Sequence, residues 1–393
     1  MSHKITAGID IGTHQVRVVV AENLGANNLP KILGGGSSLS KGLRHGYIIN
    51  GSECLKSVGA AVAQAEKSSG ERIRRAYLSV GGIGLSSTTG NGQAIISRGD
   101  QTITELDLDL AVQTAEESIP GAVIQNRKII YTIPINWKID GKLVLGRVLG
   151  LKGLKLEVKV LFVTCLESHI NDLLEAVEEA GIDVIDVVAS PIAASFVTLG
   201  KPQKMAGCVL CNIGAETLSI VVFENNIPIS IEVFPIGGAD ITNDIALGLR
   251  VALEEAESIK LGGITQSSYP RKKLEEIIEA RLGDMFEFIE NHLKKIGKNG
   301  LLPAGIILTG GGSYMNSIEE VARGALHLPS RVASLKVNDG KIVIKDSSWS
   351  VAYGLCIMGT IPEEEDRLGF NRHSGTFLNI FGKIWDWLKQ FLP

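Results

Sequence analysis

The chain has 393 residues, more than the roughly 250 to 300 at which a single core stops growing, so we expect two or more domains. Hydrophobic residues make up 45% and the net charge is −4, which predicts a packed globular protein and argues against a nucleic-acid partner. No apolar run reaches the roughly 18 residues of a spanning helix, and the first residues leave no room for a targeting segment, so we expect a cytoplasmic location.

A segment near the start of the chain returns in altered form half a chain later. Residues 9–22 align with residues 211–224 at a constant offset of 202 (212 − 10), which places Asp10 opposite Asn212. Each copy is a β-branched run, a turn centred on glycine and a second β-branched run, the pattern of two antiparallel strands in a hairpin. The sequence therefore predicts a duplicated architecture with two facing hairpins.

The first half of the chain continues in α/β order and is then interrupted. We expect a helix capped by Ser52 and a strand over 76–80. Between about 83 and 159 the pattern changes to serine, threonine and glycine turns, a helix over 106–118 and short strands over 129–133 and 143–149. This change predicts a small α+β insert.

Regular α/β order then resumes. A strand, a helix and a strand over 158–164, 168–181 and 182–188 predict a crossover unit in a mostly parallel sheet. After the second hairpin we expect the following elements in order: a strand over 227–234, a helix over 240–260, a long amphipathic helix over 271–295, a strand over 304–309 and a helix over 348–358.

The cysteines predict core residues with reduced thiols. Cys208 and Cys211 have the spacing of a metal motif, but three steps along a strand put them on opposite faces. The histidines form no set with metal-ligand spacing either. The sequence therefore predicts no transition-metal site.

The two hairpin turns have the features of a phosphate site. A glycine in a tight turn lets backbone N–H groups point into a concavity that suits phosphate oxygens. Asp10 enters the first turn, from where its carboxylate could hold Mg²⁺ through water. Residues 310–312 are three glycines between a strand and a helix, where the backbone could lie against a base or an α-phosphate. The repetition predicts a nucleotide cleft.

These motifs resemble those of the actin-like ATPase superfamily. Residues 10–13 and 212–217 resemble its two phosphate motifs, residues 308–312 its adenosine motif, and residues 257–260 its adenine-side helix, although Glu257 and Lys260 would equally form an exposed charge pair. The resemblance implies a duplicated actin-like (ribonuclease H-like) α/β fold with two lobes around a cleft that binds ATP and Mg²⁺. It also implies a set of nucleotide-binding residues: Asp10, Gly12, Thr13, His14, Gln15, Asn212, Gly214, Ala215, Glu216, Thr217, Gly237, Gly238, Glu257, Lys260, Gly310, Gly311, Gly312 and Ser313.

Further landmarks resemble the FtsA family of bacterial cell-division proteins. They are residues 7–12, 234–238, 240–244 and 352–354, together with the position of the insert and the C-terminal segment. The resemblance implies six parts: a first lobe (1–82 and 162–205), an inserted subdomain for self-association (83–161), a second lobe (206–238 and 301–360), a smaller partner-docking subdomain (239–300), a flexible linker (361–375) and a membrane-targeting helix (376–393).

Two departures from the superfamily pattern concern catalysis. The second phosphate motif usually begins with Asp and often has another Asp seven residues later, where this chain has Asn212 and Ser219. A neutral amide removes a charge directed at Mg²⁺, so we expect ATP binding with weak or no turnover. Ala215 and Glu216 also replace glycines in that loop, and a bound phosphate would repel the Glu216 carboxylate unless that side chain points away.

The last stretch of the chain predicts an amphipathic helix. Its apolar side chains recur at steps of three and four, with indole rings beside the stripe, and it is too short to span a bilayer, so it would lie in the membrane interface. The preceding linker is acidic and poor in apolar residues. The expected membrane-binding residues are Phe377, Ile380, Phe381, Ile384, Trp385, Trp387, Leu388 and Phe391.

The family resemblance implies a protein that polymerises on the cytoplasmic face of the inner membrane at the division septum. Its implied partners are the C-terminal peptide of the tubulin-like protein FtsZ, further copies of itself, membrane lipids and other division proteins. Basic candidates for the peptide site are Arg271, Lys272, Lys294 and Lys295. Two alternatives stay open: a metabolic kinase of the superfamily, and a PilM-like pilus-assembly protein.

Overall fold

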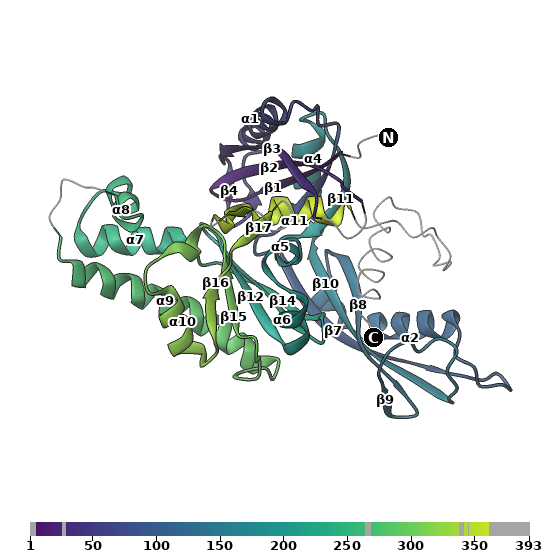
Figure 1. Cartoon of the computed structure of the whole chain (residues 1–393). Coiled ribbons are helices and arrows are strands. Elements are labelled where there is room, and N and C mark those ends of the chain that lie inside the picture. The colour runs from purple at the N-terminus through teal and green to yellow at the C-terminus, as the bar shows by residue number, and fades with distance from the viewer. Residues whose placement is uncertain (1–4, 26–28, 264–268, 338–341, 345, 361–393) are drawn as a thin grey trace.

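A computed structural model describes residues 5–25, 29–263, 269–337, 342–344 and 346–360. The linker and the amphipathic helix expected at 361–375 and 376–393 lie outside the described residues. Figure 1 shows two lobes that each contain a sheet, a helical part beside the second lobe, and an insert that projects at the lower right. Within the described residues, no helix is both long and apolar enough to cross a bilayer.

The first lobe is built on a five-stranded sheet in the order β11-β6-β1-β2-β3. Its strands are β1 (Ile5–Ile11), β2 (Gln15–Glu22), β3 (Lys31–Leu39), β6 (Arg75–Val80) and β11 (Asp183–Ala189). β1 and β2 form the first predicted hairpin, and β6 pairs in parallel with both β1 and β11. The strands predicted over 76–80 and 182–188 are confirmed as β6 and β11. The glycine-rich β3 was not predicted.

Helix α1 (Gly51–Ser69) lies on this sheet along β3. A Cβ atom at Gly36 of β3 would lie 2.1 Å from a backbone oxygen of α1, so only a glycine there allows the close approach. The predicted cap at Ser52 was wrong. Asn50 is the N-cap, because its side-chain oxygen accepts a hydrogen bond from the Glu53 amide.

The second lobe contains a five-stranded sheet in the order β14-β13-β12-β15-β16. Its strands are β12 (Cys208–Ile213), β13 (Leu218–Glu224), β14 (Ile227–Phe234), β15 (Ile306–Thr309) and β16 (Ser330–Val332). β12 and β13 form the second predicted hairpin, β14 extends it in antiparallel fashion, and β15 and β16 continue in parallel from β12.

The two sheets repeat one topology. In each, a three-stranded antiparallel meander is followed by two parallel strands, so β1, β2 and β3 correspond to β12, β13 and β14, while β6 and β11 correspond to β15 and β16. The predicted duplication is confirmed and extends well beyond the two hairpins. Residues at equal heights in the two sheets can therefore be compared directly.

The insert is a separate four-stranded sheet in the order β7-β10-β8-β9, with helix α2 (Glu105–Glu117) packed on it. The strands are β7 (Leu85–Ile95), β8 (Arg127–Ile139), β9 (Lys142–Val144) and β10 (Lys155–Leu166). The predicted α+β insert and its helix are confirmed. The turns expected at its start are instead the eleven-residue β7, whose serines, threonines and glycines pair along β10.

The predicted crossover unit was wrong, because β10 pairs with β7 and β8 and not with β11. Its apolar run resembles a buried parallel strand since both of its faces are covered. Val158 and Phe162 pack in the core of the insert, whereas Leu161 and Val163 pack in the core of the first lobe. The boundary expected between the insert and the first lobe, at residues 161 and 162, therefore falls inside a continuous strand.

The helical part consists of α7 (Gly238–Leu249), α8 (Leu253–Lys260) and α9 (Arg271–Lys295). The bounds of α9 match the predicted 271–295. The single helix expected over 240–260 is two helices, because Arg250 adopts a left-handed conformation (φ 58°) that ends α7. Figure 1 shows these helices extending to the left of the second sheet.

The remaining elements belong to the two lobes, except α3, which lies in the insert. They are β4 (Leu43–Arg44), β5 (Tyr47–Ile48), α3 (Gly121–Ile124), α4 (Glu167–Glu178), α5 (Ser190–Thr198), α6 (Lys201–Ala206), η1 (Gly311–Tyr314), α10 (Ile318–Leu326), β17 (Leu335–Val337), β18 (Ile342–Ile344), η2 (Ser347–Trp349) and α11 (Ser350–Met358). Cys208 and Cys211 are both buried and pack in different cores, which confirms that they lie on opposite faces of β12.

Candidate functional site

The two hairpin turns have the same geometry. The amide of Gly12 donates to the carbonyl of Gln15 at 3.2 Å, and the amide of Gly214 donates to the carbonyl of Thr217 at 2.8 Å. A Cβ atom at either glycine would lie 3.0 Å from the carbonyl oxygen across its turn. Thr13 and His14 form the tip of the first turn, at the positions that Ala215 and Glu216 occupy in the second.

Asp10 lies at the centre of a polar row that crosses three strands. Its carboxylate accepts a hydrogen bond from the Ser79 hydroxyl at 2.7 Å, and Arg17 is its partner on β2. Burial raises the pKa of Asp10, against the hydrogen bond from Ser79 and the charge of Arg17, which both lower it. A cation near this carboxylate would favour its ionised form.

The second sheet carries the equivalent row with different chemistry. Asn212 is paired with Thr309 on one side and with Ser219 on the other. Asn212 thus corresponds to Asp10, and Ser219 corresponds to Arg17. The first row contains a carboxylate and a guanidinium, whereas the second contains no charged side chain.

The three glycines at 310–312 pack against the second hairpin. A Cβ atom at Gly310 would lie 2.3 Å from the Asn212 side-chain oxygen, and one at Gly312 would lie 2.4 Å from Ile213. A Cβ atom at Gly311 would meet nothing within 4 Å, so its surface is open. The four-residue 3₁₀ helix η1 begins at Gly311 and so includes the last two of these glycines, and the α-helix expected after the glycines begins only at α10.

Ser313 does not point into open space. It is fully buried, and its hydroxyl donates to the Gly310 carbonyl at 2.7 Å and lies 3.3 Å from the Ser347 hydroxyl. These bonds shape the glycine loop from within. The nucleotide contact expected at Ser313 stays a prediction, and the hydroxyl of this residue helps to hold the loop.

Gly237 and Gly238 hold the second turn in place. The Gly238 amide donates to the Gly214 carbonyl at 2.9 Å, and the Ala239 amide donates to the Ala215 carbonyl at 2.7 Å. A Cβ atom at Gly237 would lie 2.5 Å from the Ala215 oxygen. The start of α7 is thereby fastened to the turn.

Glu257 and Lys260 form an ion pair that is only partly exposed. Lys260 Nζ lies 2.6 Å from the Glu257 carboxylate and donates to the Gly238 carbonyl at 3.0 Å. Burial acts to raise the pKa of Glu257, but hydrogen bonds from Lys260 and Thr242 and the charge of His14 hold it below its ordinary value.

Glu216 reaches across to the first lobe. Its carboxylate accepts a hydrogen bond from the His45 amide at 2.6 Å, and its backbone oxygen lies 3.1 Å from Nδ1 of the His45 ring. The carboxylate thus points away from its own turn, as a bound phosphate would require. Sequence reasoning missed His45, because nothing local indicates that the β4–β5 turn meets a residue 171 positions later.

The described residues contain no cluster of three or more His, Cys, Asp or Glu side chains placed to hold a metal ion. A single carboxylate at Asp10 suits Mg²⁺, which keeps most of its waters and is held by one or two carboxylates and phosphate oxygens. Asp10 would therefore hold this ion through water.

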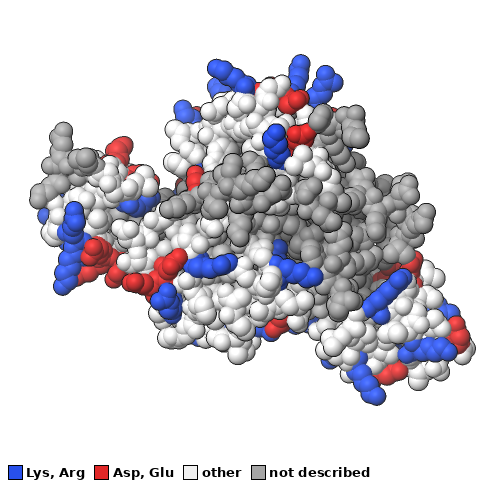
Figure 2. Space-filling model, viewed as in Figure 1, with Lys and Arg blue, Asp and Glu red and all other residues white. Residues whose placement is uncertain are grey.

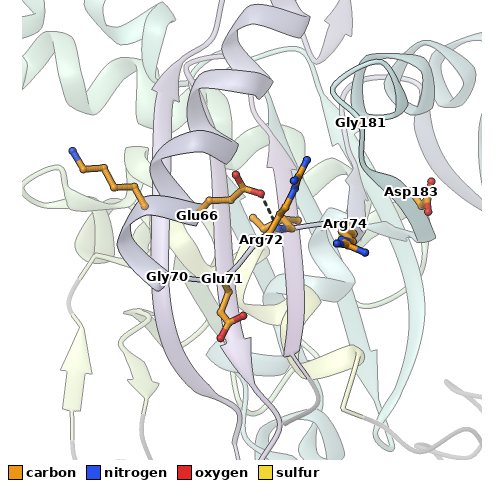
Figure 3. Close-up of a pocket in the computed structure, with 9 residues that line it drawn as sticks. Glu66, Gly70, Glu71, Arg72, Arg74, Gly181 and Asp183 are labelled. Atoms are coloured by element: carbon orange, nitrogen blue, oxygen red, sulfur yellow. Dashed lines mark hydrogen bonds between the residues drawn. The ribbon is translucent and has the colours of Figure 1, made fainter. Parts of the chain in front are cut away.

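One surface hollow lies away from the hairpin turns. Its lining includes Glu66, Arg72, Arg74 and Asp183, and Glu66 accepts a hydrogen bond from the Ile73 amide at 2.8 Å (Figure 3). The hollow lies where β6 begins, whereas the first turn follows the end of β1. Because β6 runs parallel to β1, the hollow and the first turn lie at opposite ends of these strands. The hollow is therefore separate from the candidate nucleotide site.

Family comparisons cover the second lobe and the insert. Residues 209–354 match the family model described as "Cell division protein FtsA", and residues 84–164 match the model described as "SHS2 domain inserted in FTSA". The second match begins one residue before β7 and ends within β10, the first and last strands of the insert in chain order. It thus assigns nearly all of β10 to the insert, in agreement with the strand pairing.

Relatives that align with at least 90% of this chain are also described as cell division protein FtsA. The chain is 28% identical over 380 residues to the cell division protein FtsA of Pseudomonas aeruginosa, covering 91% of this chain and 90% of that protein. It is 29% identical over 376 residues to that of Bacillus subtilis, covering 90% and 83%, and 26% identical over 416 residues to that of Escherichia coli K12, covering 98% and 96%.

Solved structures show the fold. The structure of a PilM–PilN type IV pilus biogenesis complex matches with a TM-score of 0.65 at 17% identity, covering 91% of this chain and 99% of that chain. MreB5 of Spiroplasma citri bound to ADP matches with a TM-score of 0.52 at 12% identity, covering 90% and 96%. The chain therefore has the actin-like fold that these structures share.

Proposed function

Because this chain belongs to the FtsA family of bacterial cell-division proteins, we propose that it is an actin-like protein that binds ATP, polymerises at the cytoplasmic membrane and tethers the FtsZ ring there. One observation carries the proposal: two sheets of identical topology present equivalent glycine turns at residues 12–15 and 214–217. In this proposal the six parts named from the sequence serve as lobes, insert, docking subdomain, linker and anchor, with the insert extended to the end of β10.

The nucleotide would be gripped by the two turns and by the open surface of Gly311. Backbone N–H groups of the turns would bind the phosphates, and Asp10 would hold Mg²⁺ through water. The ion's contribution would be to neutralise phosphate charge. The neutral row around Asn212 supports binding with weak turnover, because it offers no carboxylate to position an attacking water.

The membrane contact is assigned to the C-terminal segment, on sequence grounds. An aromatic amphipathic helix of this length lies in the interface and does not span the bilayer. This assignment places the protein on the cytoplasmic face of the inner membrane at the septum, as a peripheral protein. It also separates the proposal from a PilM-like role, which ordinarily lacks such a tail.

The peptide of FtsZ would dock on the helical part of the second lobe, around α7 to α9. The basic candidates on α9 are partly neutralised, since Lys272 lies 3.8 Å from Glu276 and Lys294 lies 2.9 Å from Glu290. On the face drawn in Figure 2, Lys and Arg side chains are interspersed with Asp and Glu side chains over these helices and over the insert. An acidic peptide would therefore dock mainly through its apolar side chains.

Electron microscopy of the full chain on an anionic lipid monolayer tests this proposal. With MgATP we expect filaments on wild-type monolayers and none when residues 376–393 are deleted, while the deleted protein keeps its ATP affinity. Filaments that form equally well without the segment would contradict the anchor. Rapid ATP-dependent phosphorylation of a small acceptor would favour the kinase alternative instead.

A further inference from the structure

We propose that Glu216 and His45 form a latch that links the second phosphate turn to the root of the insert, so that nucleotide binding alters the insert through this contact. The inference rests on the proposed nucleotide site and adds a regulatory connection to it. It starts from the two interactions between these residues, which join a turn of the second lobe to the β4–β5 turn of the first.

The first link is a charge-assisted bond to a constrained turn. The His45 amide donates to the Glu216 carboxylate at 2.6 Å, and bonds to an ionised acceptor are stronger than neutral ones. His45 has a φ of 48° and Gly46 a φ of 88°, the left-handed pair of the two-residue turn that joins β4 and β5. The bond to Glu216 fastens this turn to the second lobe.

The second link joins this turn to the segment that enters the insert. A Cβ atom on Gly46 would lie 2.3 Å from the Cα atom of Gly82, so the two backbones are in direct contact. The Ile83 amide donates to the His45 carbonyl at 3.3 Å, and the Leu85 amide donates to the Gly82 carbonyl at 3.1 Å. β7, the first strand of the insert, begins at Leu85.

The third link connects the segment before β7 to β8 and β10, two other strands of the insert. Arg127, the first residue of β8, donates to the Gly84 carbonyl at 2.7 Å and to the Thr164 hydroxyl of β10 at 2.9 Å. The ring of His169 lies 2.9 Å from the Gly81 carbonyl and 4.8 Å from the ring of Tyr47, which follows Gly46. A continuous set of contacts thus runs from the phosphate turn to three strands of the insert.

Phosphate binding would act on this set at its first link. Phosphate oxygens beside the second turn repel the Glu216 carboxylate, which favours the conformer that points to His45. Nucleotide binding would therefore strengthen the latch and stiffen residues 43–48 and 81–85. Because the insert is the subdomain proposed for self-association, its orientation would respond to the nucleotide.

Hydrogen exchange of the full chain tests the latch, first without nucleotide. We expect Glu216→Ala to raise exchange about tenfold at residues 43–48 and 81–85, because the opening of this local unit is no longer opposed by the bond. Glu216→Gln keeps an acceptor oxygen and should stay within about threefold of wild type. Glu224→Gln is the matched control, since Glu224 lies on the same hairpin but pairs with Lys298. Unchanged exchange in Glu216→Ala would overturn the latch.

The same measurement with MgATP separates the latch from the proposed function. In the wild type, protection should extend from residues 212–217 to residues 81–85, and in Glu216→Ala it should stop at the phosphate turn. Protection that still reaches residues 81–85 in the variant overturns the connection while ATP binding stands. If the wild type gains no protection anywhere, the proposed function fails, and the nucleotide-free comparison still decides whether the latch exists.

Discussion

Asn212 occupies in the second sheet the position that Asp10 occupies in the first. Its neighbours Ser219 and Thr309 likewise correspond to Arg17 and Ser79. The duplication has thus kept the backbone and changed the charge. Since one row is charged and the other neutral, the two halves of a clamp around a triphosphate would have unequal roles. The first would direct the metal ion, and the second would contribute backbone donors.

This asymmetry predicts a gain of turnover in Asn212→Asp. A carboxylate at this position would restore a group directed at Mg²⁺ and at the attacking water, and we expect the rate of phosphate release to rise at least about tenfold. Asn225→Asp, in the exposed β13–β14 turn, is the control and should leave the rate unchanged. Equal rates in wild type and Asn212→Asp would show that turnover is limited elsewhere.

The glycine loop offers a matched pair of substitutions. Gly310 has a φ of 88° and no space for a Cβ atom beside Asn212, whereas Gly311 has open space. We expect Gly310→Ala to lower the free energy of unfolding by about 2 kcal/mol and to weaken ATP binding, because strain and a steric clash act together. Gly311→Ala should change stability by less than about 0.5 kcal/mol. Thermal unfolding of both variants checks this, and equal losses would contradict it.

Burial of His292 predicts a loss of stability in mild acid. Its Nε2 atom lies 2.8 Å from the Ser230 hydroxyl, and burial first, then the charge of Lys295, lowers its pKa from 6.5 to about 4. Between these values the unfolded chain binds a proton that the folded chain does not, so stability rises with pH from about 4 to 6.5 and falls on acidification.

Urea unfolding between pH 4 and pH 7 measures this effect. We expect His292→Gln to remove on the order of 2 kcal/mol of the pH dependence. His327→Asn replaces an exposed histidine and should keep the wild-type slope. A slope that survives in His292→Gln would place the titrating group elsewhere.

Lys204 is a second buried basic side chain, and its burial should cost stability. Its ammonium lies over the rings of Phe196 and Phe223 and 3.2 Å from the Ser195 hydroxyl, and burial lowers its pKa from 10.5 to about 7. The folded chain therefore binds fewer protons than the unfolded chain between pH 7 and 10.5, and stability rises with pH across that window.

Replacing this lysine should stabilise the protein at neutral pH. We expect Lys204→Met to raise the free energy of unfolding at pH 7 by about 1–3 kcal/mol and to flatten the rise above pH 7. Lys56→Met, on the exposed side of α1, serves as the control. A less stable Lys204→Met protein would mean that the contacts of the ammonium outweigh its desolvation.

The duplication could be predicted from the sequence because a hairpin is a local structure. Its two β-branched runs and its glycine turn are contiguous in the chain. The long helix α9 was predicted to its end residues for the same reason: its apolar period is uninterrupted from Arg271 to Lys295. The pairing of strands that are distant in sequence could not be predicted from the sequence. β10 has the composition of a parallel strand, and only its partners β7 and β8 show that it belongs to the insert.

The site shows the same limit. Local motifs identified both turns and the glycine loop, but they gave no information on which donors are already used within the protein. Lys260 and the amide of Gly238 bind protein atoms, and Glu216 finds its partner in His45 of the other lobe. Such pairings depend on the packed fold, since the residues that form them are distant in sequence.

Calorimetric titration of MgATP into the full chain tests the central claim most directly. The account predicts saturable binding at one site per chain, weakened in Gly310→Ala and weakened further when Mg²⁺ is removed with EDTA. Absence of saturable binding in the wild type, with the protein folded, would contradict the proposal that the two equivalent turns grip a nucleotide.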